Sequence, residues 1–262
     1  MLSVTQGTLG LASGSLVGFS LGLVGGGGSI LAVPLLIYLV GVSDPHVAIG
    51  TSALAVSVNA FVNLMGHWRA GTVKWPCATV FAASGIVGAA LGSSLGKIVD
   101  GRKLLALFAL AMIAVGIAML RPRAAGGNAD VRITPRIALQ LMAVGIVAGG
   151  ISGFFGIGGG FLIVPGIMLG SGMPILNAIG SSLLSVGVFG LTTAVNYAFS
   201  GLVAWTIAAE FIIGGALGGW LGTVSALKMA ASRRLLARIF AAVIFVVALY
   251  MLARTGFVLG PT

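Results

Sequence analysis

Two glycine-rich stretches decide the fold of this chain of 262 residues. Residues 18–36 read GFSLGLVGGGGSILAVPLL, and residues 149–167 read GGISGFFGIGGGFLIVPGI. The stretches share five Gly residues, a Leu, a Val and a Pro in the same order, at one offset of 131 residues. Ordered Gly and Pro matches at a fixed offset rarely arise by chance in apolar sequence. We therefore interpret the chain as a tandem duplication.

The repetition continues outward from these stretches. AIGTS at 48–52 matches AIGSS at 178–182, Trp75 matches Trp205, and RKLLA at 102–106 matches RRLLA at 233–237. The offset stays at 130 or 131 residues. The predicted organisation is a first repeat at 1–120, a linker at 121–136 and a second repeat at 137–262.

The composition indicates a membrane protein. Hydrophobic residues make up 58% of the chain, charged residues only 7%, and the mean hydropathy is +1.17. Such a chain cannot cover a soluble globule with charge, and it is far too apolar to be disordered. Helices satisfy their backbone hydrogen bonds internally, whereas a barrel would show alternating strands. We predict an all-α polytopic membrane protein.

The apolar segments set the predicted topology. Each half contains about five, and the segments at 29–41 and 161–172 are short and follow a Gly cluster, as half-helices would. An odd number of crossings per half gives inverted repeats and places ten cations on one side against four, Lys97, Arg102, Lys103 and Arg254, on the other. An even number would divide them equally. Because cytoplasmic loops collect Lys and Arg, we predict inverted repeats with a cytoplasmic linker.

Glycine also recurs every four residues in several segments, for example at Gly14, Gly18 and Gly22 and at Gly145, Gly149 and Gly153. Such stripes let helix backbones approach closely. The pattern does not distinguish contacts within one chain from a homodimer through the Gly-rich faces.

The Gly clusters are the first candidate site. A Gly run inside an apolar segment is tolerated only where it is buried in protein or lines a wet cavity, and a half-helix beginning there directs N–H groups at whatever fills that cavity. Two such starts would favour an anion near the midplane. The alternative is a tight hairpin that only needs close packing. The predicted N–H donors belong to Gly27, Gly28, Ser29, Gly158, Gly159 and Gly160.

Polar side chains in apolar segments are further candidates. Thr51, Ser52, Ser181 and Ser182 occupy the duplicated AIG(T/S)S positions, where their hydroxyls could donate to an oxyanion or bond back to their own helix. Asn59 is an amide that should face the bundle interior.

Three ionisable residues are predicted to take part in coupling or gating. Glu210 lies within an apolar segment, which suggests a proton-coupling group, although a carboxylate paired at the interface would fit as well. His67 and Arg69 lie at a segment end, where Arg69 could collect anions or only mark the cytoplasmic face. By contrast, Asp44 before Pro45 reads as a helix cap.

At this point the motifs identify a family resemblance. GLVGGGGSILAVPLLIYLVG, VAIGTSALAV and GHWRAGTVKW, with GFFGIGGGFLIVPGIMLGSGMP and NAIGSSLLS, resemble the sulfite exporter TauE/SafE family of membrane transporters over essentially the whole chain. The resemblance implies transport of sulfur-containing anions such as sulfite or organosulfonates across a bacterial inner membrane.

The predicted function is therefore secondary transport of a small anion, most plausibly a sulfur oxyanion or an organosulfonate, by alternating access. The expected partners are this anion and membrane lipids, without nucleic acid, cofactor or metal. No enzyme is predicted. Ser20 fits the G-x-S-x-G pattern and Ser152 resembles an intramembrane-protease serine, but the strand–turn–helix context is missing and the candidate bases, His46 and His67, lie near segment ends. A passive anion channel and, less favoured, an intramembrane hydrolase are the alternatives.

Overall fold

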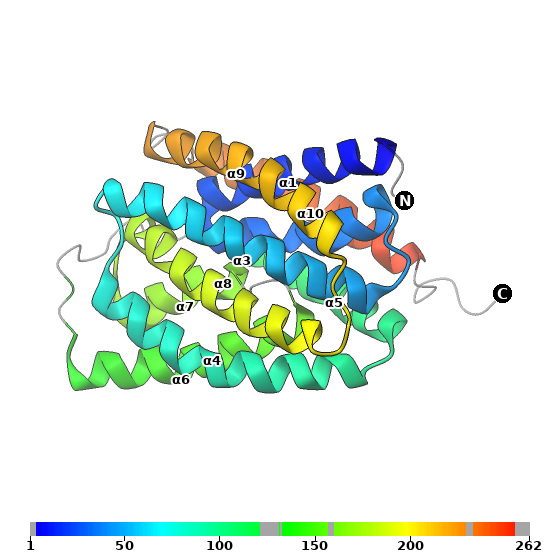
Figure 1. Ribbon diagram of the computed structural model, residues 1–262. Coiled ribbons are helices and arrows are strands. Elements are labelled where there is room, and N and C mark those ends of the chain that lie inside the picture. The colour runs from blue at the N-terminus through cyan, green and yellow to red at the C-terminus, as the bar shows by residue number, and fades with distance from the viewer. Residues whose placement is uncertain (1–3, 121–130, 132, 157–159, 229–232, 255–262) are drawn as a thin grey trace.

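The computed structural model describes residues 4–120, 131, 133–156, 160–228 and 233–254, and every regular element among them is helical (Figure 1). Six helical stretches in this part of the chain are long and apolar enough to span a membrane. The all-α polytopic prediction is confirmed. The longer helices are α1 (Val4–Val24), α3 (Pro45–Arg69), α4 (Trp75–Ile98), α5 (Gly101–Leu120), α6 (Pro135–Phe155), α8 (Ile175–Ala198), α9 (Trp205–Lys228) and α10 (Arg233–Arg254).

The short element of each half follows a turn at a glycine. In the first half, Gly25 has φ +71°, and the chain continues as a 3₁₀ helix η1 (Gly25–Leu31), a short α2 (Ala32–Leu35) and a π-helical η2 (Leu36–Val40). The segment runs back along α1, because Gly41 lies close to Gln6. In the second half, Gly156 has φ +66° and the short helix is α7 (Gly160–Ser171). The predicted short elements are thus present, and the first begins four residues earlier than expected.

Local signals in the sequence explain where α3 begins. The Asp44 carboxylate accepts a hydrogen bond from the His46 N–H (2.8 Å), and Pro45 occupies the first turn, where it needs no N–H partner. The predicted Asp44 cap is confirmed.

The glycine stripes form two seams inside the chain. A Cβ added at Gly18 on α1 would overlap the carbonyl oxygen of Gly215 on α9, and one added at Gly149 on α6 would overlap that of Gly85 on α4. Neighbouring glycines advance together along both helices of each seam, so the paired helices are parallel. The α1–α9 and α4–α6 seams lie at opposite edges of the bundle (Figure 1). The stripes therefore serve contacts within one chain, and a homodimer remains a prediction.

Between the seams, α3 and α8 cross at the centre. Ser57 Oγ donates to the carbonyl oxygen of Gly187 (2.6 Å), and Gly187 is the repeat counterpart of Ser57 at the 130-residue offset. A residue that meets its own counterpart lies on the axis that relates the two halves. Helix α1 also runs parallel to α9, the third long helix of the other half. Inverted repeats stay a prediction. The orientation of the halves in a membrane, the cytoplasmic linker and the domain bounds stay predictions.

Candidate functional site

Two of the predicted hydroxyl residues join the halves at helix starts. Ser181 Oγ on α8 accepts a hydrogen bond from the Lys74 N–H, just before α4 (2.8 Å). Its counterpart Thr51 on α3 accepts from the Ala204 N–H, just before α9 (2.9 Å). Both hydroxyls are fully buried. Each half thus positions the third long helix of the other half, α4 or α9.

The other two hydroxyls lie at the glycine turns. Ser182 Oγ donates to the Ile179 carbonyl of its own helix (2.7 Å) and accepts from the Gly26 N–H of the other half (3.5 Å). Ser52 Oγ lies 2.9 Å from the Ile49 carbonyl oxygen and 3.3 Å from that of Gly156. Each serine hydroxyl therefore bonds back to its own helix, which was the alternative to a role as an oxyanion donor. Each also contacts the glycine turn of the opposite repeat.

In the first glycine turn, the available N–H group is that of Gly26 rather than those of the predicted donors Gly27, Gly28 and Ser29. In a 3₁₀ helix each N–H bonds to the carbonyl three residues back. The cap of η1 is Val24, so from Gly27 onward the segment supplies its own acceptors, and Gly26 presents the N–H that faces Ser182. Ser29 Oγ turns back to the Gly26 carbonyl (2.7 Å).

The matching turn of the second half is described only in part. Gly158 and Gly159 lie outside the described residues, and Gly160 begins α7. Helix α7 packs against η1, so the two short elements meet in the bundle.

A buried polar ladder follows α3 toward α9. Asn59 Nδ2 donates to the Phe211 carbonyl (3.4 Å), and Asn63 Oδ1 accepts from Thr223 Oγ1 (2.9 Å). One helical turn further, both ring nitrogens of His67 lie within hydrogen-bond distance of partners, Thr72 Oγ1 (3.0 Å) and the Gly22 carbonyl oxygen (3.1 Å). His67 is fully buried, whereas Arg69 at the end of α3 is exposed.

Glu210 is separate from the glycine turns. It lies on α9 opposite Gly7 and Gly10 of α1, where Cβ atoms would come within 3.1 Å and 2.9 Å of its carboxylate oxygens. One oxygen, Oε2, is buried without a hydrogen-bond partner among the described residues. The glycines of α1 thus make room for this carboxylate.

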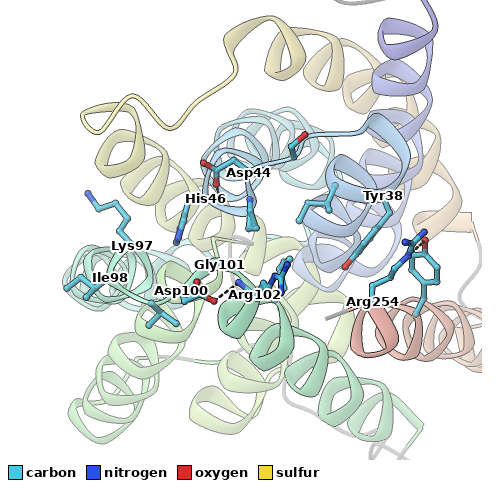
Figure 2. Close-up of a pocket in the computed structure, with 15 residues that line it drawn as sticks. Tyr38, Asp44, His46, Lys97, Ile98, Asp100, Gly101, Arg102 and Arg254 are labelled. Carbon is cyan, nitrogen blue, oxygen red and sulfur yellow. Dashed lines mark hydrogen bonds between the residues drawn. The ribbon is translucent and has the colours of Figure 1, made fainter. Parts of the chain in front are cut away.

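Sequence reasoning missed a cavity of about 860 Å³ at the end of the bundle where α3 and α5 begin and α10 ends (Figure 2). Its charged residues come from separate helix ends, so no local motif announces it. The signal available in the sequence was the grouping of Lys97, Arg102, Lys103 and Arg254 on one predicted side, and three of these line the cavity. The charged and titratable lining residues are Tyr38, Asp44, His46, Lys97, Asp100, Arg102, Tyr250 and Arg254.

Comparison with known proteins gives a consistent result. The family model described as "Sulfite exporter TauE/SafE" matches residues 10–251. A probable membrane transporter protein of Xylella fastidiosa (strain 9a5c) is 55% identical over 246 residues, which cover 94% of each chain. The probable membrane transporter protein YunE of Bacillus subtilis (strain 168) is 29% identical over 242 residues, or 84% of this chain and 87% of the relative. No solved structure gives a significant match.

The family match spans nearly the whole chain, and the relatives are named as membrane transporters. Together with the six apolar helices, this identifies a multi-pass membrane protein, in agreement with the expected bacterial inner-membrane location. The chain belongs to the sulfite exporter TauE/SafE family of membrane transporters.

Proposed function

We propose that this protein carries a small anion across the membrane and binds it between the two halves, where Gly26 faces Ser182 and Gly156 faces Ser52. The observation that carries the proposal is the reciprocity of these contacts. Each turn combines a buried hydroxyl of one repeat with the backbone break of the other. A ligand held there would contact both halves at once.

The donors among these groups, which are the Gly26 N–H and the two serine hydroxyls, suit an oxyanion, whereas Gly156 presents its carbonyl oxygen, an acceptor, to Ser52. An anion accepts hydrogen bonds, and a hydroxyl or a backbone N–H can donate one without placing a full positive charge in the membrane. The Gly26 N–H makes only a long bond of 3.5 Å to Ser182. Because a serine hydroxyl rotates, Ser182 could exchange its bond to the Ile179 carbonyl for one to a ligand, at small cost.

The proposed substrate is a sulfur oxyanion or an organosulfonate. This rests on the family description and on the resemblance of the motifs, since backbone and hydroxyl donors would suit other small oxyanions as well. Transport by alternating access would follow if one half rocks against the other about the α3–α8 crossing. The family description also favours transport over catalysis.

We propose that transport is coupled to a proton gradient through the polar residues where α3 packs against α9, which we call the polar side of the bundle. Glu210 lies near the start of α9 and His67 near the end of α3, and both are titratable. The buried amides of Asn59 and Asn63 lie between them. Arg69 is exposed at the end where His67 lies, and there it would attract anions or lipid headgroups.

The test is anion flux into proteoliposomes with sulfite and sulfoacetate as probes. We expect Ser182→Ala and Ser52→Ala each to raise KM about tenfold, because a hydrogen bond to a charged group contributes roughly 1.5–3 kcal/mol. Ser84→Ala is the matched control, since Ser84 also donates to the carbonyl three residues back (3.0 Å) but lies on the α4–α6 seam. An unchanged KM in the Ser52→Ala, Ser182→Ala double variant would contradict the proposed site. Flux that ignores an imposed proton gradient and shows single-channel conductance would favour the channel.

A further inference from the structure

The cavity at the end of the bundle has the features of a second ligand site. It lies outside the glycine turns, between η2, the starts of α3 and α5, and the ends of α4 and α10. Its volume of about 860 Å³ falls in the range of small-molecule sites, roughly 300–1,000 Å³.

The two acidic residues in this cavity are engaged in capping helices. Asp44 accepts from the His46 N–H, and one Asp100 oxygen accepts from the N–H groups of Arg102 (3.1 Å) and Lys103 (3.2 Å). Each carboxylate thus compensates the positive end of a helix. Neither forms an ion pair with a cation of the described residues, so the cations of the cavity are not neutralised by direct pairing.

Among the cations of the cavity, Arg102 is the least engaged. The Lys97 ammonium donates to the Asn196 carbonyl and side-chain oxygens and to Ser200 Oγ, which occupies all three of its protons. Arg254 is held by Tyr250, whose hydroxyl accepts from Nε (3.1 Å). The guanidinium of Arg102 has no hydrogen-bond or ion-pair partner in the described part of the chain. Figure 2 shows it directed into the space between His46 and Tyr38.

The cavity also has an apolar wall next to this guanidinium. Tyr38 and Tyr250 pack edge to face, with ring centroids 5.1 Å apart, and Leu105 contributes a buried side chain. A guanidinium binds planar oxyanions through two parallel hydrogen bonds, and aromatic rings bind carbon. A ligand that uses both must carry an anionic group and an apolar part.

The duplication explains only part of this lining. Arg102 corresponds to Arg233 in the repeated RKLLA and RRLLA motifs, whereas Tyr38 corresponds to Leu169 and His46 to Leu176. The aromatic and imidazole groups around Arg102 therefore belong to one end of the molecule, although the helices that carry them occur at both.

We propose that this cavity binds an organic anion, with the anionic group on Arg102 and the apolar part against Tyr38 and Leu105. A site at the bundle end would receive or release the anion on its way to the glycine turns. That role in transport rests on the proposed function, whereas binding in the cavity does not.

The experiment measures binding to the purified full-length protein by calorimetry, with benzenesulfonate as the probe. The Ser52→Ala, Ser182→Ala variant serves as the background, so that the glycine-turn site contributes little. We expect Arg102→Gln to weaken binding at least tenfold. Lys103→Gln is the matched control, because Lys103 is the next residue, is also exposed and is also capped by Asp100, but does not line the cavity. Its binding constant should change less than twofold.

Two comparison ligands test the chemistry. Benzenesulfonamide has the same ring without the charge, and methanesulfonate has the charge without the ring; both should bind at least tenfold more weakly than benzenesulfonate. The proposal is overturned if benzenesulfonate does not bind, if Arg102→Gln behaves like Lys103→Gln, or if the sulfonamide binds equally well. Arg102-dependent binding without flux of any anion would refute the proposed function alone. Flux with binding that ignores Arg102 would refute the cavity alone.

Discussion

The α1–α9 and α4–α6 seams have the same backbone packing and different side-chain chemistry. In both, glycines of one helix lie against backbone carbonyls of the other, in matching registers. The residues that α3 and α8 present to them differ. Asn59 lies against Gly215 on one side, and its counterpart Phe189 lies against Gly85 on the other. His67 corresponds to Tyr197, and Glu210 to Val80.

This difference shows that the backbone packing of the seams does not depend on the polar residues Asn59, His67 and Glu210. At the position of Asn59 an aromatic residue fills the α4–α6 side without hydrogen bonds, so an amide is not required there to build the seam. An amide does occur nearer the end of α8, where Asn196 donates to Ser93 and Ser94 of α4. Buried polar groups cost free energy unless they are paired. We infer that the polar side of the bundle was retained for function, and the following variants test that inference.

The largest effect should come from the feature that both seams share. Gly149→Ala would overlap the Gly85 carbonyl, and Gly18→Ala that of Gly215. Backbone cannot yield as a flexible side chain does, so we expect each to destabilise by about 3 kcal/mol, or roughly 6–12 °C in Tm in detergent. Gly150→Ala is the control, because its nearest atom, the Gly88 carbonyl oxygen, lies 3.8 Å from the added Cβ. Equal melting temperatures for Gly149→Ala and Gly150→Ala would contradict the seams.

The next effect should distinguish the two sides. Asn63 donates to the Asn59 carbonyl (2.8 Å) and accepts from Thr223, whereas its counterpart Thr193 is buried and its hydroxyl has no partner among the described residues. Asn63→Leu leaves the Thr223 hydroxyl without an acceptor and should lower the free energy of unfolding by about 1–2 kcal/mol. Thr193→Val should be neutral or stabilising. Chemical denaturation of both variants checks this, and equal losses would mean that the sides are equivalent.

A smaller effect is expected at the central crossing. Ser57→Ala removes the hydrogen bond to the Gly187 carbonyl and should cost about 1 kcal/mol. Ser185→Ala, on α8, removes a buried hydroxyl that has no partner among the described residues and should cost nothing. The same denaturation assay applies. A greater loss in Ser185→Ala would show that α3 does not hold the crossing as described.

The smallest change in stability is expected at Glu210. Glu210→Gln keeps the shape between Gly7 and Gly10 and should leave Tm within about 2 °C, because the carboxylate forms no ion pair with the described residues that would be lost. If Glu210 couples transport to protons, flux in proteoliposomes should no longer respond to an imposed pH gradient. Val80→Gln, at the equivalent place on the apolar side, should keep the response. A gradient response that survives Glu210→Gln would remove this residue from the coupling proposal.

Much of the architecture followed from residue patterns. Gly every four residues predicted close helix contacts, the Gly25 and Gly156 breaks marked the turns, and Asp44 marked a helix start. The partners of the stripes could not be predicted, because any two Gly-rich faces satisfy the same pattern. Each half packs its first helix against a helix of the other half, and this pairing arises only in the folded chain. Helix α1 pairs with a helix about 200 residues away, as the hydrogen bond from Ser15 to the Gly214 carbonyl shows.

The candidate site was predictable in position more than in detail. Duplication singled out Ser52 and Ser182, and both lie at the glycine turns. The sequence could not reveal that a 3₁₀ helix places the Gly26 N–H there, since helix type depends on how the turn packs. The cavity around Arg102 depends on four helix ends that meet only in the folded chain.

The pairing of α1 with α9 has a consequence for how the protein is made. Ribosomes add about 5–20 residues per second, so α1 is in the membrane for roughly 10–40 s before its partner helix exists. During that time its glycine stripe faces lipid or an insertion factor. The same exchange bears on ancestry. Before the duplication, a half-length chain could have made this helix pairing only with a second copy, so the ancestor would have been a dimer with swapped first helices.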